Sequence, residues 1–131
     1  MAKQIGRLSS EQLSEVVVKG MQEKKAEDIM VLDLRKVKNA VADFFVIGSG
    51  NSDTHVGAIA ESVDYEVNKI CGESPWHQEG KNNKTWVLLD YVDIVVHVFS
   101  HEKRIFYNLE TLWGDAVITK YDELSKIEAQ V

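Results

Sequence analysis

The 131-residue sequence has few features that constrain a chain covalently, with a single cysteine, Cys71, and a single proline, Pro75. One cysteine cannot form an intrachain disulfide, which excludes the disulfide-stapled secreted class and favours a reducing, cytoplasmic compartment. No apolar run approaches the roughly 18 residues needed to cross a bilayer. The first seven residues have no apolar run behind them, so we also expect no signal peptide. Internal repeats and low-complexity tracts are absent, which favours one domain.

An excess of basic residues is also missing. The formal net charge is -6, whereas broad binding to a phosphate backbone requires a basic face. An acidic chain suits a basic protein partner better, although solubility alone accounts for the same charge. The 44% of hydrophobic residues is enough to form a core and too much for a disordered chain.

Hydrophobic periodicity predicts seven elements in the order αββαββα. Ser9 or Ser10 caps the first helix, with Gln12 completing a capping box, and Asn51 or Ser52 caps the second, which Gly72 ends. The expected ranges are helices over 10–25, 53–71 and 101–116, and strands over 28–34, 43–49, 85–89 and 94–99. This order predicts an α/β fold, a small mixed sheet flanked by helices. We place the domain at residues 1–118 and a polar C-terminal tail at 119–131.

The strands over 85–89 and 94–99 form a predicted hairpin. If Tyr91 and Val92 make a two-residue turn, Asp90 faces Asp93, Leu88 faces Val95, and Trp86 faces His97. Two carboxylates that face each other destabilise a hairpin unless a cation or donor lies between them. The pair therefore indicates a metal or nucleotide site, or a contact for a partner's Lys or Arg. Alternatively, both acids cap loops or point into solvent.

Two further residues near this hairpin are candidates. His97 lies between apolar neighbours, which is typical of a core histidine. It is a poor candidate for a metal ligand, because the sequence places no second His or Cys within obvious reach. Trp76 follows Pro75 in a loop that Gly80 ends with an expected positive φ. An exposed Trp76 would anchor a partner, or its ring packs back onto the domain.

On the third helix, a projection at 100° per residue places Tyr107 opposite the centre of the apolar face. Arg104 and Glu110 fall on either side of Tyr107. Such a group is typical of a protein contact, and a solvated face explains it equally well.

The stretch from Gly48 to Ser52 connects a strand to a helix N-terminus, a geometry that can hold a phosphate. It resembles the glycine-serine turn of nucleotidyltransferases, in which a nearby strand carries an Asp-x-Asp or Asp-x-Glu metal pair. That pair is absent, and neither Ser49 nor Ser52 with His55 has a third catalytic member. We therefore expect no catalytic residue, no metal and no cofactor, and a tight turn explains the glycines.

Taken together, the chain resembles the ribosomal silencing factor family, also called Iojap-like, from about Leu8 to Val117. The stretches that carry this resemblance are Val31–Arg35, Ala42–Gly50, Ser52 with His55–Val56, Glu79–Gly80, Trp86–Phe99, and Arg104, Tyr107, Leu109–Glu110 and Leu112–Trp113. One departure is Val92, where the family usually has glycine. If that position takes a positive φ, Val92 is strained or the turn has changed type.

The resemblance implies a nucleotidyltransferase-like fold that lacks the catalytic metal acids. It also implies a cytoplasmic repressor of translation rather than an enzyme. Family members bind the large ribosomal subunit at its ribosomal protein fourteen and sterically block association with the small subunit. They tend to form homodimers.

Under this interpretation, we predict partner contacts within the segment from Trp76 to Trp113. The predicted contact residues are Trp76, Asp90, Tyr91, Asp93, Arg104, Tyr107 and Glu110. Two alternatives stay open at this point. One is a nucleotide-binding or nucleotidyltransferase-like enzyme that uses the loop from Gly48 to Asn51. The other is a homodimeric scaffold that associates through Tyr107.

Overall fold

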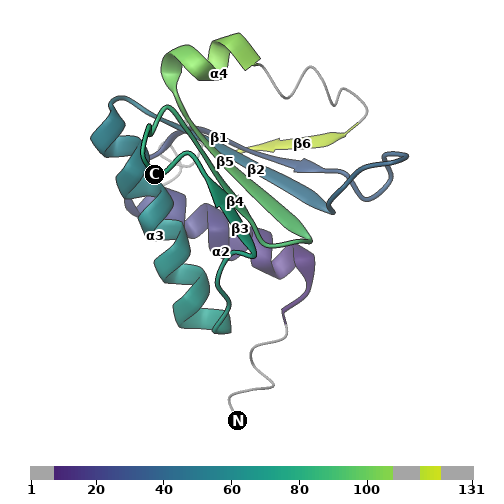
Figure 1. Cartoon of the computed structure of the whole chain (residues 1–131). Helices are drawn as coiled ribbons and strands as arrows, with labels where there is room; N and C mark the ends of the chain where they lie inside the picture. Colours follow the sequence, from purple (N-terminus) through teal and green to yellow (C-terminus); the bar gives the residue numbers. More distant parts are fainter. Residues whose placement is uncertain (1–7, 108–115, 122–131) are drawn as a thin grey trace, which may run out of the picture.

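The computed structural model describes residues 8–107 and 116–121, without the side chains of residues 105–107. A six-stranded mixed sheet forms its centre, in the order β3-β4-β5-β2-β1-β6 (Figure 1). Strands β2 and β5 are parallel, and the other neighbouring pairs are antiparallel. The elements are α2 (Ser10–Glu23), β1 (Glu27–Asp33), β2 (Phe44–Gly50), α3 (Asp53–Cys71), β3 (His77–Glu79), β4 (Trp86–Asp90), β5 (Ile94–Ser100), α4 (His101–Tyr107) and β6 (Val117–Lys120). The predicted mixed sheet flanked by helices is confirmed.

The two long helices begin and end where the sequence indicates. The Ser9 side chain accepts from the backbone of Gln12, whose side chain accepts from the backbone of Ser9, so the capping box is present. Ser52 caps α3, and Gly72 ends it in the left-handed conformation at φ 71°. These local signals require no tertiary information, which explains why the sequence is sufficient to predict them.

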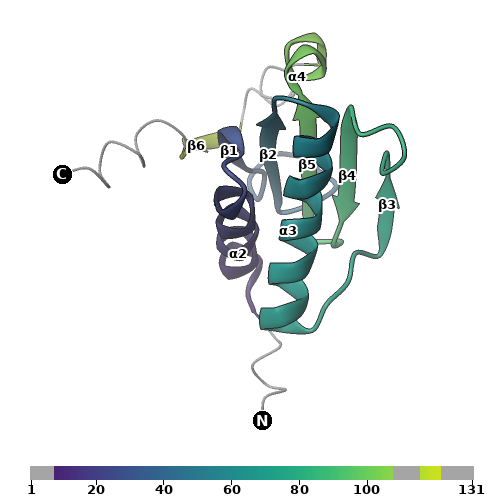
Figure 2. The same cartoon turned by 90° about the vertical axis from the view of Figure 1, so that its left-hand side faces the viewer.

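Helices α2 and α3 cover one face of the sheet side by side (Figures 1 and 2). They approach closely at Gly20, where a Cβ atom would lie 2.9 Å from Cα of Val63. The Ser62 hydroxyl donates to the backbone carbonyl of Gly20 at 2.7 Å and fixes this contact. The main hydrophobic cluster lies between these helices and the sheet, with fully buried Val17, Ile59 and Val96 among its members.

A second, smaller cluster lies on the opposite face of the sheet. Its buried members include Phe45, Ile47 and Phe99, and the residues that follow β1 contribute apolar side chains to it. Strand β2 is consequently buried along its whole length, as its near-continuous apolar sequence predicts. Trp86 and Leu88 on this face are only partly buried.

Two edge strands differ from the prediction. Strand β3 lies within residues 73–83, where we expected only a loop, and all three of its residues are exposed. Strand β6 pairs with β1, with Val117 opposite Asp33, and it crosses the domain boundary that we expected at residue 118. Thr119 and Lys120 therefore belong to the sheet rather than to a tail. Both strands are short and exposed, and they lack the alternation that marks a half-buried strand. Residues 108–115 of the helix expected over 101–116 lie outside the described residues, and Ala116 is described but is not helical.

Candidate functional site

Trp76, Asp90 and Asp93 lie at one end of the sheet, around the turn between β4 and β5. The backbone N–H of Trp76 donates to the carbonyl of Asp90 at 2.8 Å, so the loop before β3 is fixed against the end of β4. The carbonyl of Asp93 accepts from the backbone N–H of Asp43 at 2.8 Å, which attaches the turn to the start of β2. We call this region the turn end of the sheet.

The predicted register of the hairpin is wrong by two residues. The N–H of Tyr91 donates to the carbonyl of Ile94 at 2.8 Å, so the turn consists of Val92 and Asp93 rather than Tyr91 and Val92. The observed partners are Asp90 with Val95, Leu88 with His97, and Trp86 with Phe99. Asp90 and Asp93 therefore do not face each other, and no paired-acid site exists in the hairpin.

The burial of Tyr91 explains this shift. Val87, Leu89 and Tyr91 alternate along the chain, and all three are buried against α3 and its neighbours. Keeping Tyr91 on this buried face extends the paired region beyond Asp90 and moves the turn toward Ile94. Tyr91 is 5% exposed, and its hydroxyl has no hydrogen-bond partner among the described residues. Burial raises the pKa of this hydroxyl. Tyr91 is a core residue, and its burial argues against the predicted partner contact.

Val92 takes a positive φ, the conformation in which the glycine usual at this position of the family would be unstrained. Its φ is 77°, while Asp93 is not among the positive-φ residues, which is the pattern of a type II′ turn. Glycine favours this position, and a side chain with a Cβ atom there costs about 1–2 kcal/mol. One carboxylate oxygen of Asp90 accepts from the N–H of Val92 at 2.8 Å and stabilises the turn. Asp90 thus has a structural role and is only partly exposed.

Among the predicted contacts that the structure describes, Trp76 and Asp93 are exposed. Trp76 is 73% exposed, and within the described residues its ring makes an edge-to-face contact with the His77 ring, with the centroids 6.0 Å apart. It therefore does not pack back onto the described part of the domain. Asp93 is exposed in the turn. The turn end presents an aromatic ring and a carboxylate to solvent.

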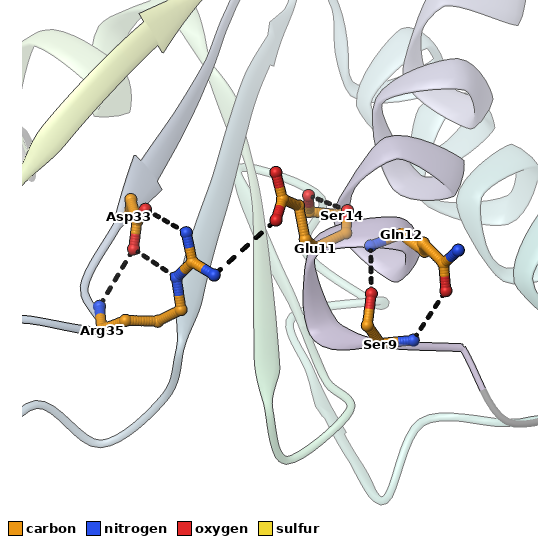
Figure 3. A network of polar contacts seen from close by, with 6 residues as sticks. All are labelled: Ser9, Glu11, Gln12, Ser14, Asp33 and Arg35. Carbon is orange, nitrogen blue, oxygen red and sulfur yellow. Dashed lines mark hydrogen bonds and ion pairs between the residues drawn. The ribbon is translucent and has the colours of Figure 1, made fainter.

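A polar network occupies the same end of the molecule, where the residues after β1 meet the start of α2 (Figure 3). Arg35 donates to both carboxylate oxygens of Asp33, at 3.0 and 2.7 Å, and lies 3.7 Å from Glu11. The hydrogen bond from the Arg35 side chain lowers the pKa of Asp33. The guanidinium carbon of Arg35 also lies 4.9 Å from the centroid of the Phe44 ring. Arg35 is therefore engaged within the chain.

The helical projection placed Arg104 on the exposed face of its helix, and this placement is wrong. Arg104 is 7% exposed, and its guanidinium donates to the hydroxyl of Ser49 and to the carbonyl of Asp28, both at 2.8 Å. Helix α4 directly follows the C-terminal end of β5 (Figure 1). Arg104 is a residue of α4, whereas Asp93 directly precedes β5, so the two lie at opposite ends of that strand. A strand of seven residues separates the two ends by roughly 20 Å. The helical projection could not detect this burial because it contains no information on the neighbouring strands.

The remaining predicted contacts cannot be placed in the same way. Tyr107 is the last residue of α4, but its side chain lies outside the described residues, as does all of Glu110. Sequence reasoning missed Val41, which is 76% exposed in the connection before β2. Its sequence neighbourhood gave no signal, because an isolated exposed valine in a loop is ordinary.

His97 is a core histidine, as predicted, although its polar atoms are only partly satisfied. Its Nδ1 accepts from Nε1 of Trp86 at 3.1 Å, while the buried Nε2 has no hydrogen-bond partner among the described residues. The ring packs edge-on against Phe45 and parallel to Phe99. Burial lowers the pKa of His97 from 6.5 to about 4. The imidazole is therefore neutral at physiological pH.

Several polar groups of the glycine-serine stretch are engaged within the chain. Gly48, Ser49 and Gly50 lie within β2, and the fully buried Ser49 hydroxyl accepts from Arg104. At the N-terminus of α3, the N–H of Asn51 donates to Nδ1 of His55, and the N–H of His55 donates to the Ser52 hydroxyl. These contacts use two of the backbone donors near the start of α3 that a phosphate could otherwise bind. Within residues 8–107 and 116–121, no three side chains of His, Cys, Asp or Glu are grouped closely enough to hold a metal ion.

The fold and this site define a class of protein: a small α/β domain with a mixed sheet, two helices on one face, and exposed aromatic and acidic side chains at one end of the sheet. No helix in the described part of the chain is long and apolar enough to cross a membrane. Comparison with known proteins identifies the family within this class.

The family model described as "Ribosomal silencing factor during starvation" matches residues 7–131. A ribosomal silencing factor from Halalkalibacterium halodurans is 40% identical over 112 residues, which cover 83% of this chain and 92% of the relative. One from Bacillus subtilis is 38% identical over 115 residues, covering 88% and 96% respectively. A crystal structure of a Chromobacterium violaceum protein aligns with a TM-score of 0.76 at 31% identity, covering 82% of this chain and 88% of that one. The chain therefore belongs to the ribosomal silencing factor family.

Proposed function

We propose that this protein represses translation by binding the large ribosomal subunit at its ribosomal protein fourteen and sterically blocking association with the small subunit. The observation that carries the proposal is the match of the silencing-factor family over residues 7–131. The name of that family connects the activity to starvation. Under this proposal, the protein acts in the cytoplasm and reduces the number of joined ribosomes when nutrients are scarce.

The turn end is the part of the described surface that best supports a protein contact. Trp76 supplies a large exposed ring, and aromatic side chains dominate the binding energy of many interfaces. Asp93 supplies an exposed carboxylate that suits a basic group on the partner. The net charge of -6 favours a basic protein over the ribosomal RNA as the direct contact. Tyr107 and Glu110 remain proposed contacts on the basis of the sequence.

Steric occlusion requires no chemistry, and we propose that the protein is not an enzyme and uses no cofactor. The engaged N–H groups of Asn51 and His55 support this, because these two donors are used within the chain and are not available to a phosphate. We expect calorimetry with ATP and magnesium to give no saturable heat. Binding at micromolar concentration would instead favour the nucleotide-binding alternative.

The direct test is a gradient experiment with purified subunits. The protein is expected to sediment with free large subunits and to reduce the fraction of joined ribosomes as its concentration rises. Failure to sediment with large subunits would refute the proposal. Isolated protein is expected to be a homodimer, and measurement of its mass with and without large subunits shows whether the two associations are compatible.

A further inference from the structure

Three hydrophobic side chains are exposed around the turn end, although they come from three separate segments. Val41 is 76% exposed, Trp76 is 73% exposed, and Val92 is 55% exposed. Hydrogen bonds connect their segments: Trp76 to Asp90, the Asp90 side chain to Val92, and Asp93 to Asp43, each at 2.8 Å. These hydrogen bonds connect the three segments that carry the exposed apolar side chains, so the segments are held against one another at the turn end.

Val92 is the informative member of this group. Its φ of 77° lies in the region that favours glycine, and a β-branched residue there is an outlier. Its side chain belongs to neither hydrophobic cluster of the described residues. Within the described chain, packing of the isopropyl group thus offsets little of the strain. Strained positions that persist without an internal benefit are concentrated at functional surfaces.

The charges around these residues indicate the chemistry of a partner. The carboxylate of Asp93 is exposed, and Asp43 lies beside it through the backbone hydrogen bond. Arg35, the nearby cation after β1, is engaged with Asp33 and Glu11. Lys36 and Lys38 are exposed farther along the same connection. Exposed apolar side chains, an exposed carboxylate and exposed lysines therefore occur together on these segments, and such a composition is typical of a protein interface.

We propose that Val92 is an apolar contact in a protein interface at the turn end, and that this interface extends across the connection between β1 and β2 to Val41. The partner is a protein that presents an apolar surface to Val41, Trp76 and Val92 and a basic side chain to Asp93. This inference rests on the proposed function, in which the partner is the ribosomal protein of the large subunit. It adds Val41 and Val92 to the contacts and explains why a strained valine is present.

Replacement of Val92 by glycine separates stability from binding. Val92→Gly relieves the backbone strain, so the midpoint of urea denaturation is expected to stay the same or rise. The same change removes an exposed apolar contact, so the dissociation constant for large subunits is expected to rise about fivefold. Val41→Ser is expected to weaken binding similarly without changing the urea midpoint, because Val41 is exposed.

Lys84→Gly is the matched control. Lys84 also has a positive φ, 62°, and is exposed, but it precedes β4 at the opposite end of that strand from the turn. Its replacement is expected to leave the dissociation constant within twofold of the wild-type value. Both measurements use the full chain and intact large subunits.

The outcomes distinguish this inference from the proposed function. If the wild-type protein does not bind large subunits, both are wrong. If the wild-type protein binds and Val92→Gly binds equally well, the proposed function stands and the contact at Val92 is refuted. A lower urea midpoint for Val92→Gly would refute the argument from strain.

Discussion

Removal of the Arg104 side chain is expected to destabilise the fold rather than remove a partner contact. Arg104→Ala deletes two hydrogen bonds from a charged donor, one to the Ser49 hydroxyl and one to the Asp28 carbonyl. Hydrogen bonds of this kind contribute about 1.5–3 kcal/mol each, and the completely buried Ser49 is left without this donor. We expect a loss of about 3 kcal/mol in the free energy of unfolding, which lowers the Tm by roughly 10 °C.

Urea denaturation followed by circular dichroism measures this loss. Arg104→Lys is expected to lose less, because an ammonium retains the charge but cannot donate in two fixed directions. Glu102→Gln is the control on the same helix, since Glu102 is exposed, and it is expected to change stability by about 0.5 kcal/mol or less.

Two results would refute this reasoning. If Arg104→Ala unfolds within about 1 kcal/mol of the wild-type value, the buried hydrogen bonds do not stabilise the fold as argued. If this variant also fails to bind large subunits while it is fully folded, Arg104 is a partner contact, as the helical projection predicted.

Two other predictions concern His97 and Trp76. Because burial lowers the pKa of His97 from 6.5 to about 4, the unfolded chain binds the extra proton first as the pH falls. The contribution of His97 to the free energy of unfolding is fully present above about pH 6.5 and is lost as the pH falls toward about 4. The expected loss between pH 7 and pH 5 is about 2 kcal/mol. His97→Gln, which keeps an acceptor for Trp86, should flatten the pH dependence of urea denaturation, and an unchanged slope would contradict this. Trp76→Ala should weaken large-subunit binding at least about tenfold, whereas the exposed Tyr65→Ala control should not; equal losses would point to a nonspecific effect.

The parts of the fold that the sequence predicts are those determined by local signals. The capping box at Ser9 and the left-handed Gly72 depend only on neighbouring residues. The buried strand β2 is continuously apolar and therefore recognisable. In contrast, β3 consists of three exposed residues, and only its pairing with β4 makes it a strand. Such pairing is a tertiary property that hydrophobic alternation cannot indicate.

The candidate site was predictable only in part, for related reasons. Trp76 was identified because a loop tryptophan stands out in the sequence, and its exposure agrees. The register of the hairpin depends on whether Tyr91 faces the core. The amino-acid composition of the turn does not determine this, so the turn was placed at Tyr91 and Val92. The burial of Arg104 was not predicted because its partners, Ser49 and Asp28, lie 55 and 76 residues away in the sequence.

The most direct test of the central claim is the rate of subunit association followed by light scattering. Purified large subunits are incubated with increasing concentrations of the protein and then mixed with small subunits. Steric occlusion predicts that the amplitude of association falls with protein concentration and saturates at one protein per large subunit. Association that proceeds unchanged at concentrations that saturate the large subunit would contradict the account.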